Sequence, residues 1–99
     1  MTKNIKFGIV QGRLTQSPIG CLQWFPRGVW HKEFQIASEI GIHYIELIAE
    51  IQHNIENPIW SQNGIEKIKQ LTKDNNLMIY ALCNDFIVKH HFLLEEVIF

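Results

Sequence analysis

The stretch VWHKEFQIASEIGIHYIELI (residues 29–48) decides the fold class, because its hydrophobic spacing changes halfway along. In residues 29–40 the apolar side chains recur at i, i+4 and i+7, which predicts a helix. These helical positions are Trp30, Phe34 and Ala37. Gly41 follows where a left-handed cap would end the helix, since glycine adopts positive φ without steric cost. Residues 43–48 are short and mostly apolar, and they predict a strand.

Elements of alternating type flank this stretch on both sides. Two more strands are predicted at residues 5–11 and 77–83, a helix at 62–75, and the start of a further helix at about 91–98. Long loops at 12–28 and about 50–60 separate them. The first loop exceeds the usual length of about 2–6 residues for a strand-to-helix connection, and such loops tend to be functional.

The order is therefore β-α-β-α-β, which predicts an α/β fold with parallel strands joined by right-handed crossovers. Residues 1–99 supply one partial domain, because parallel strands usually belong to larger sheets that helices cover. For the helix at 62–75, Asn63 with Glu66 fits a variant capping box, and Ser61 is a rival cap.

Composition excludes several classes of protein. The 99 residues are 46% hydrophobic, and their formal net charge is −1, which argues against a nucleic-acid or membrane-surface binder. No apolar run reaches the roughly 18 residues of a membrane helix, and the first residues lack the apolar stretch of a secretory signal. Cys21 and Cys83 stand far apart, which predicts free thiols and a cytoplasmic protein.

Several motifs, in order, resemble one family. The segment Ile9-Val10-Gln11-Gly12-Arg13-Leu14 is similar to the first strand of the xylose isomerase-like TIM barrels, in particular the bacterial sugar phosphate isomerase/epimerase proteins, also called AP endonuclease family 2. Further matches follow at Phe25-Pro26 with the Trp-x-x-Glu-Phe helix start, at 41–47, at Asn57-Pro58-Ile59-Trp60 with Gly64, and at 82–86. The resemblance covers about residues 5–87 and departs from the family's pattern after Phe86.

This resemblance implies the first three strands of an incomplete (β/α)8 barrel, whose full form needs about 250 residues. It also implies metal-assisted proton transfer on a sugar or sugar phosphate in a full-length parent. Family members hold a divalent cation through later strands, so we expect no metal site in this chain and no activity from it alone. The expected partners are the sugar substrate, and a second copy or a complementing chain.

Barrel enzymes build their sites at the carboxyl ends of strands. Successive residues of a strand point to opposite faces, so every second residue shares a face. In the first predicted strand one such set is Phe7, Ile9 and Gln11, and in the third it is Ile79, Ala81 and Cys83. In the second strand, Tyr44, Glu46 and Ile48 lie opposite Ile45 and Leu47. Glu46 is the candidate catalytic residue, because a carboxylate on an apolar strand is costly to bury unless it is paired. It would accept a substrate hydroxyl or transfer a proton; an ion pair with Arg13 is the structural alternative.

Four further residues are candidate substrate contacts. Gln11 and Arg13 would bind hydroxyls or a phosphate, although a structural role as strand-end anchors is slightly favoured for both. Trp24 would stack on a sugar or pack at the barrel mouth. Asp85, with Asn84, would orient substrate or form a turn.

Two other functions compete with the sugar isomerase interpretation. One is an abasic-site endonuclease-like barrel fragment, which the near-neutral charge disfavours. The other is a small stand-alone α/β binding or interaction module. We expect the fragment to expose strand edges and apolar faces, whereas a stand-alone module would unfold cooperatively.

Overall fold

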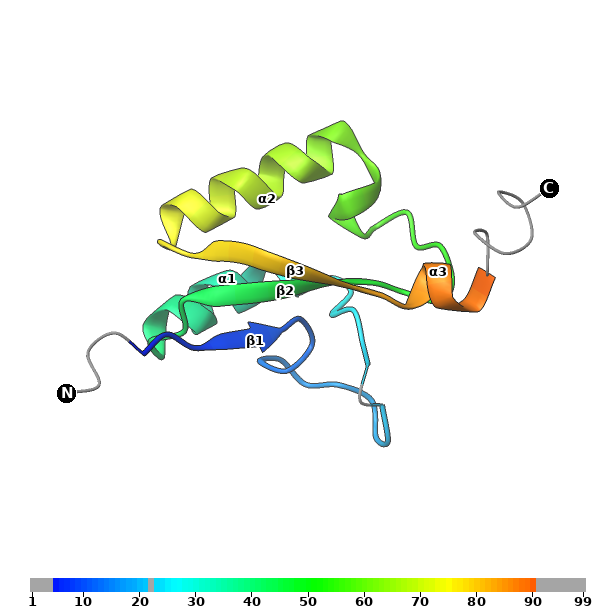
Figure 1. The fold of residues 1–99 in the computed structure, drawn as a ribbon, viewed down its shortest axis with the longest axis horizontal. Helices are drawn as coiled ribbons and strands as arrows, with labels where there is room; N and C mark the ends of the chain where they lie inside the picture. Colours follow the sequence, from blue (N-terminus) through cyan, green and yellow to red (C-terminus); the bar gives the residue numbers. More distant parts are fainter. Residues whose placement is uncertain (1–4, 22, 91–99) are drawn as a thin grey trace.

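Three parallel strands form one sheet in the computed structural model, which describes residues 5–21 and 23–90 (Figure 1). The strands are β1 (Gly8–Val10), β2 (Tyr44–Ala49) and β3 (Met78–Asn84), in the order β1-β2-β3. The helices are α1 (Trp30–Glu39), the short 3-10 helix η1 (Pro58–Trp60), α2 (Gln62–Asp74) and α3 (Asp85–His90). The predicted α/β class with parallel strands is confirmed.

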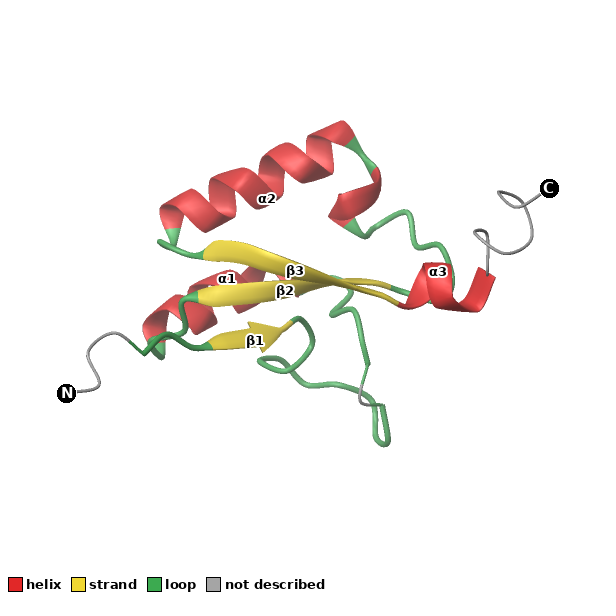
Figure 2. Ribbon diagram, in the orientation of Figure 1, coloured by secondary structure: helices red, strands yellow, loops and turns green. Residues whose placement is uncertain are grey.

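Helices α1 and α2 pack on the same face of the sheet. Phe34 of α1 and Ile68 of α2 lie in one buried cluster with Ile45 and Leu47 of β2. Alternate residues of a strand point to one side, so both helices cover that side. In Figure 2, α1 connects β1 to β2 and α2 connects β2 to β3. Because α1 and α2 both cover one face of the sheet, the other face presents a different set of side chains.

That other face holds two tyrosines and a carboxylate. The rings of Tyr44 and Tyr80 meet edge to face with centroids 5.7 Å apart. The Tyr80 hydroxyl donates a hydrogen bond of 3.1 Å to Oε1 of Glu46. A Cβ atom at Gly8 would lie 3.0 Å from the Tyr80 ring, so the absence of a side chain there makes room for the tyrosine. The expectation that Glu46 lies opposite the buried Ile45 is confirmed.

Ile9 pairs with Ile45 and packs against the helix-side cluster. One expectation about strand faces is wrong. On β3, Ile79 pairs with Ile45 but Ala81 pairs with Glu46, which leaves Tyr80 as an extra residue in a bulge. A bulge interrupts the two-residue alternation, and this is why Ile79 and Ala81 do not lie on one face as predicted.

The helix ends follow local chemistry. Gly41 adopts a φ of 88°, and its N–H bonds the Ser38 carbonyl, which confirms the predicted cap of α1. Helix α2 is capped by Ser61, whose Oγ accepts a hydrogen bond of 2.9 Å from the Gly64 N–H. The capping-box prediction at Asn63 is therefore wrong, because that residue already lies inside the helix.

The chain after β3 turns directly into α3. The Asn84 side chain accepts a hydrogen bond of 3.1 Å from the Ile87 N–H and so begins this helix, in agreement with the turn-forming alternative. The helix predicted at about 91–98 lies outside the described residues. No helix within 5–21 and 23–90 is long and apolar enough to cross a membrane.

Candidate functional site

A pocket of about 380 Å³ opens at the carboxyl end of the sheet. Its walls come from the end of the β1–α1 loop, from the end of β2 with the residues after it, and from the start of α3. The lining residues are Gln23, Trp24, Phe25, Arg27, Ile48, Glu50, Ile51, Gln52 and Asp85. The pocket therefore includes two of the predicted site residues, Trp24 and Asp85.

Glu33 on α1 shapes the first part of the loop that reaches this pocket. Its carboxylate is 2% exposed, and Oε1 accepts a hydrogen bond of 2.8 Å from the Gly12 N–H. Oε2 accepts three more, from the Leu14 N–H, the Thr15 N–H and the Thr15 hydroxyl. Four hydrogen bonds compensate the burial of one negative charge, and they fix the turn that follows β1.

Gly12 fits this turn for two reasons. Its φ of 91° lies in the left-handed region that favours glycine. A Cβ atom there would overlap the Trp24 carbonyl oxygen, so the two ends of the loop approach each other closely. The position of Trp24 thus depends on the turn that Glu33 holds.

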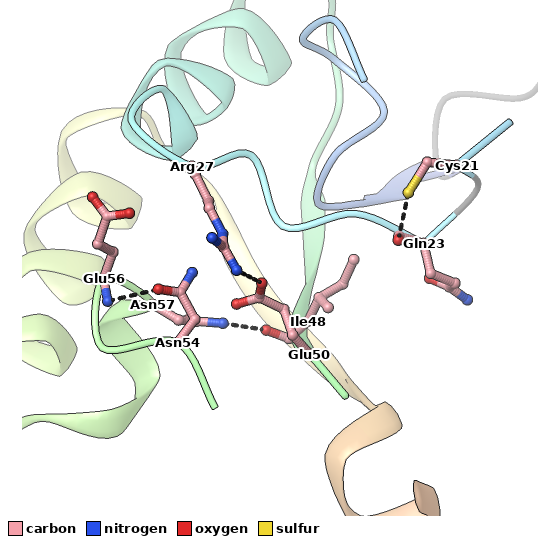
Figure 3. Close-up of polar contacts among 8 residues, drawn as sticks. All are labelled: Cys21, Gln23, Arg27, Ile48, Glu50, Asn54, Glu56 and Asn57. Atoms are coloured by element: carbon pink, nitrogen blue, oxygen red, sulfur yellow. Dashed lines mark hydrogen bonds and ion pairs between the residues drawn. The ribbon is translucent and has the colours of Figure 1, made fainter. Parts of the chain in front are cut away.

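Two buried amides complete the end of β2. The Gln11 Oε1 accepts a hydrogen bond of 2.8 Å from the Ile48 N–H, and the Asn57 Nδ2 donates one of 2.7 Å to the Ile48 carbonyl. Figure 3 shows Asn57 reaching Ile48 beside the Arg27–Glu50 pair. Gln11 is therefore a strand-end anchor, the structural alternative stated for it, and its Nε2 is buried without a partner among the residues that the structure describes.

Two residues that line the pocket each have a buried polar atom without a hydrogen-bond partner in the described part of the chain. Glu50 accepts from Arg27 through Oε2 at 3.4 Å, while its Oε1 is buried and has no partner among the described residues. The indole Nε1 of Trp24 is likewise buried, with no hydrogen-bond partner within residues 5–21 and 23–90. Buried polar atoms are normally satisfied, so Glu50 and Trp24 each keep an unused acceptor or donor beside the pocket.

Asp85 and Cys83 lie together at the end of β3. The Cys83 thiol contacts Oδ1 of Asp85 at 3.6 Å and the Gln23 Oε1 at 3.9 Å. Burial, and then the charge of Asp85, raises the pKa of Cys83, so the thiol remains protonated at neutral pH. Both cysteines, Cys21 and Cys83, are free.

Glu46 and Arg13 lie outside the pocket lining. Glu46 pairs with Tyr80 on the same sheet face as Ile48, and no ion pair with Arg13 forms among the described residues. Arg13 is exposed on the turn after β1. Burial, then the hydrogen bond to Glu46 and its charge, raises the pKa of Tyr80. Tyr80 is not among the site residues that the sequence predicts.

The structure also adds Glu50 and Arg27 to the site. Glu50 directly follows the last residue of β2, so the rule of polar groups at the carboxyl ends of strands would have found it. The sequence predicts a strand that ends at residue 48, so Glu50 falls in the predicted loop that follows. Arg27 carries no comparable local signal, because its partner lies 23 residues further along the chain.

Within residues 5–21 and 23–90, no group of three or more His, Cys, Asp or Glu residues is placed to hold a metal ion. Comparison with models of known protein families, with curated proteins and with solved structures finds no match to this chain.

Proposed function

We propose that the pocket at the carboxyl end of the sheet binds a sugar, and that the chain is the first part of a sugar phosphate isomerase/epimerase-like (β/α)8 barrel. The observation that carries the sugar proposal is the pair of unpartnered atoms, Trp24 Nε1 and Glu50 Oε1. One donates and the other accepts. A hydroxyl group both accepts and donates, so neighbouring hydroxyls of a polyol match them.

The remaining wall fits the same ligand. The Trp24 ring offers an apolar surface with a polar edge, the combination that suits the C–H face and hydroxyl rim of a sugar. Among the described lining residues, Arg27 is a cation whereas Glu50 and Asp85 are carboxylates. This charge balance favours a neutral sugar over a phosphorylated one, because a phosphate would meet two negative groups.

Support for the barrel is architectural. Both helices lie on one side of the parallel sheet, and Glu46 occupies the other side, which a closed barrel would turn inward. In a barrel Glu46 would move a proton or accept a substrate hydroxyl, with Tyr80 holding its Oε1. The described residues do not by themselves fit the divalent ion of the family, and we assign no step to it.

The test is an NMR titration of the 99-residue chain with glucose, glucose 6-phosphate and inorganic phosphate. We expect glucose to shift the Trp24 indole N–H and the backbone after β2, with a dissociation constant near 1 mM, which corresponds to about 4 kcal/mol. The indole signals of Trp30 and Trp60 are internal controls. Turnover of the sugar by the chain alone would contradict the expectation that it binds without catalysis.

A matched pair of variants separates the pocket from general charge effects. Glu50→Gln removes the open carboxylate oxygen, whereas Glu66→Gln removes the same charge from an exposed pair with Lys69 on α2. We expect the first to weaken glucose binding about tenfold and the second to leave it unchanged. Equal effects, or no shift at Trp24 at saturating glucose, would reject the sugar site.

A further inference from the structure

One carboxylate of the pocket has no positive partner among the described residues. Asp85 lines the pocket together with Arg27 and Glu50. The guanidinium of Arg27 pairs with Oε2 of Glu50 at 3.4 Å, so these two charges offset each other (Figure 3). Within residues 5–21 and 23–90, Asp85 forms no ion pair, and it accepts a contact of 3.6 Å from the neutral Cys83 thiol. The described lining therefore has one negative charge in excess.

The Cys83 thiol beside the pocket responds to this negative charge. Burial, then the charge and hydrogen bond of Asp85, and then the charge of Glu46 raise its pKa. The field that disfavours a thiolate at this end of the sheet favours a positive group there. Arg27 opposes this field only weakly, because its side chain is 53% exposed and Glu50 already pairs with it.

We propose that the sugar bound by this pocket is an amino sugar, whose ammonium group pairs with Asp85. The inference rests on the proposed sugar site and names its substrate class. An ammonium makes a charge-assisted hydrogen bond to a carboxylate, which is roughly twice as strong as a neutral one. A neutral sugar would leave the charge of Asp85 unpaired, and a phosphorylated sugar would add repulsion.

The rest of the lining fits the same ligand. Trp24 and Phe25 supply aromatic surface, which suits both the C–H groups of a sugar ring and a neighbouring cation. The Gln23 Oε1 is a further acceptor at the pocket, since the Cys83 thiol contacts it only at 3.9 Å. An ammonium has three N–H donors, so it can use this amide oxygen and the Asp85 carboxylate together.

The test is an NMR titration of the 99-residue chain at about pH 6.5, where an amino group of this kind is protonated. The ligands are glucosamine, glucose, N-acetylglucosamine and methylamine, and the signal is the Trp24 indole N–H. We expect glucosamine to bind about tenfold more tightly than glucose, with an advantage that shrinks as salt is added. Acetylation removes the charge and keeps the ring, so N-acetylglucosamine should bind no more tightly than glucose. Methylamine has the charge without the ring and should leave the signal unchanged.

A matched pair of variants tests the carboxylate directly. Asp85→Asn should weaken glucosamine binding about tenfold, to the level of glucose. Asp74→Asn makes the same change at an exposed position at the end of α2 and should leave glucosamine binding unchanged. Far-UV circular dichroism checks that both variants are folded, and the comparison of ligands on the wild-type chain does not depend on either variant.

The outcomes separate this inference from the sugar site itself. Equal affinities for glucosamine and glucose would overturn the amino-sugar proposal and leave the sugar site standing. Methylamine binding as tight as that of glucosamine would overturn it too, because the pocket would then recognise the charge alone. No shift of the Trp24 indole with either sugar would overturn both proposals.

Discussion

The buried carboxylate of Glu33 allows a quantitative prediction for the substitution Glu33→Gln. Glutamine keeps the shape but only one acceptor oxygen, which should take the place of Oε2 because Oε2 accepts three of the four hydrogen bonds. Those three hydrogen bonds then go to a neutral oxygen instead of a charged one, which weakens each of them by roughly 0.5 kcal/mol. The amide NH₂ group then faces the Gly12 N–H, and this unmatched buried donor costs about 1–3 kcal/mol.

The expected decrease in the free energy of unfolding is about 3 kcal/mol, a large part of the roughly 5–15 kcal/mol typical of a domain. It corresponds to a fall in Tm of about 12–24 °C for a chain of this length. Urea unfolding followed by circular dichroism measures it. The control is Glu39→Gln, an exposed change at the other end of α1, expected within about 0.5 kcal/mol of wild type. If the two variants unfold alike, the four hydrogen bonds do not stabilise the loop.

Two further predictions concern the loop and the open face of the sheet. Gly12→Ala should destabilise the chain by about 3 kcal/mol or more, because the new Cβ would sit at a positive φ and overlap the Trp24 carbonyl. The control is Gly20→Ala, which has a positive φ but open space around it and should destabilise the chain by only about 1–2 kcal/mol. Equal midpoints in urea would show that the close approach to Trp24 is not present. Since folding raises the pKa of Tyr80, its contribution to stability is complete at neutral pH and is lost as pH rises through that pKa. Tyr80→Phe should remove this part of the alkaline loss of stability, and an unchanged pH profile would mean that the hydrogen bond to Glu46 does not couple to folding.

The elements that the sequence predicts well are those with strong local signals. The helix expected at 29–40 is Trp30–Glu39, because its apolar spacing and Gly41 act within a few residues of each other. The third strand, expected at 77–83, is Met78–Asn84. The bulge at Tyr80 has no such signal, since the extra residue is visible only in the register against β2. One extra residue in a strand moves the side chains that follow it to the opposite face of the sheet, and the hydrophobic period of the sequence does not reveal this.

The candidate site was only partly predictable for a related reason. Trp24 and Asp85 follow from the rule that sites gather at the carboxyl ends of parallel strands, and the structure brings both into one pocket. The roles of Gln11 and Glu33 depend on partners far along the chain, 37 residues away for Ile48 and about 20 for the turn after β1. Residue type and local spacing contain no information on contacts at such separations.

These long-range contacts also connect stability to ligand binding. The Trp24 carbonyl lies against Gly12, and the Gly12 N–H is held by Glu33, so the pocket wall rests on a carboxylate that does not line the pocket. A change at Glu33 should therefore displace Trp24 and weaken sugar binding even where the chain remains folded. The Glu50→Gln variant, by contrast, should weaken binding with little loss of stability, because its ion pair is with the half-exposed Arg27. Glu33 is thus expected to act on both stability and sugar binding, whereas Glu50 is expected to act on sugar binding alone. Sugar binding and urea unfolding, measured on both variants, therefore show whether the pocket is a ligand site or only a gap between loops.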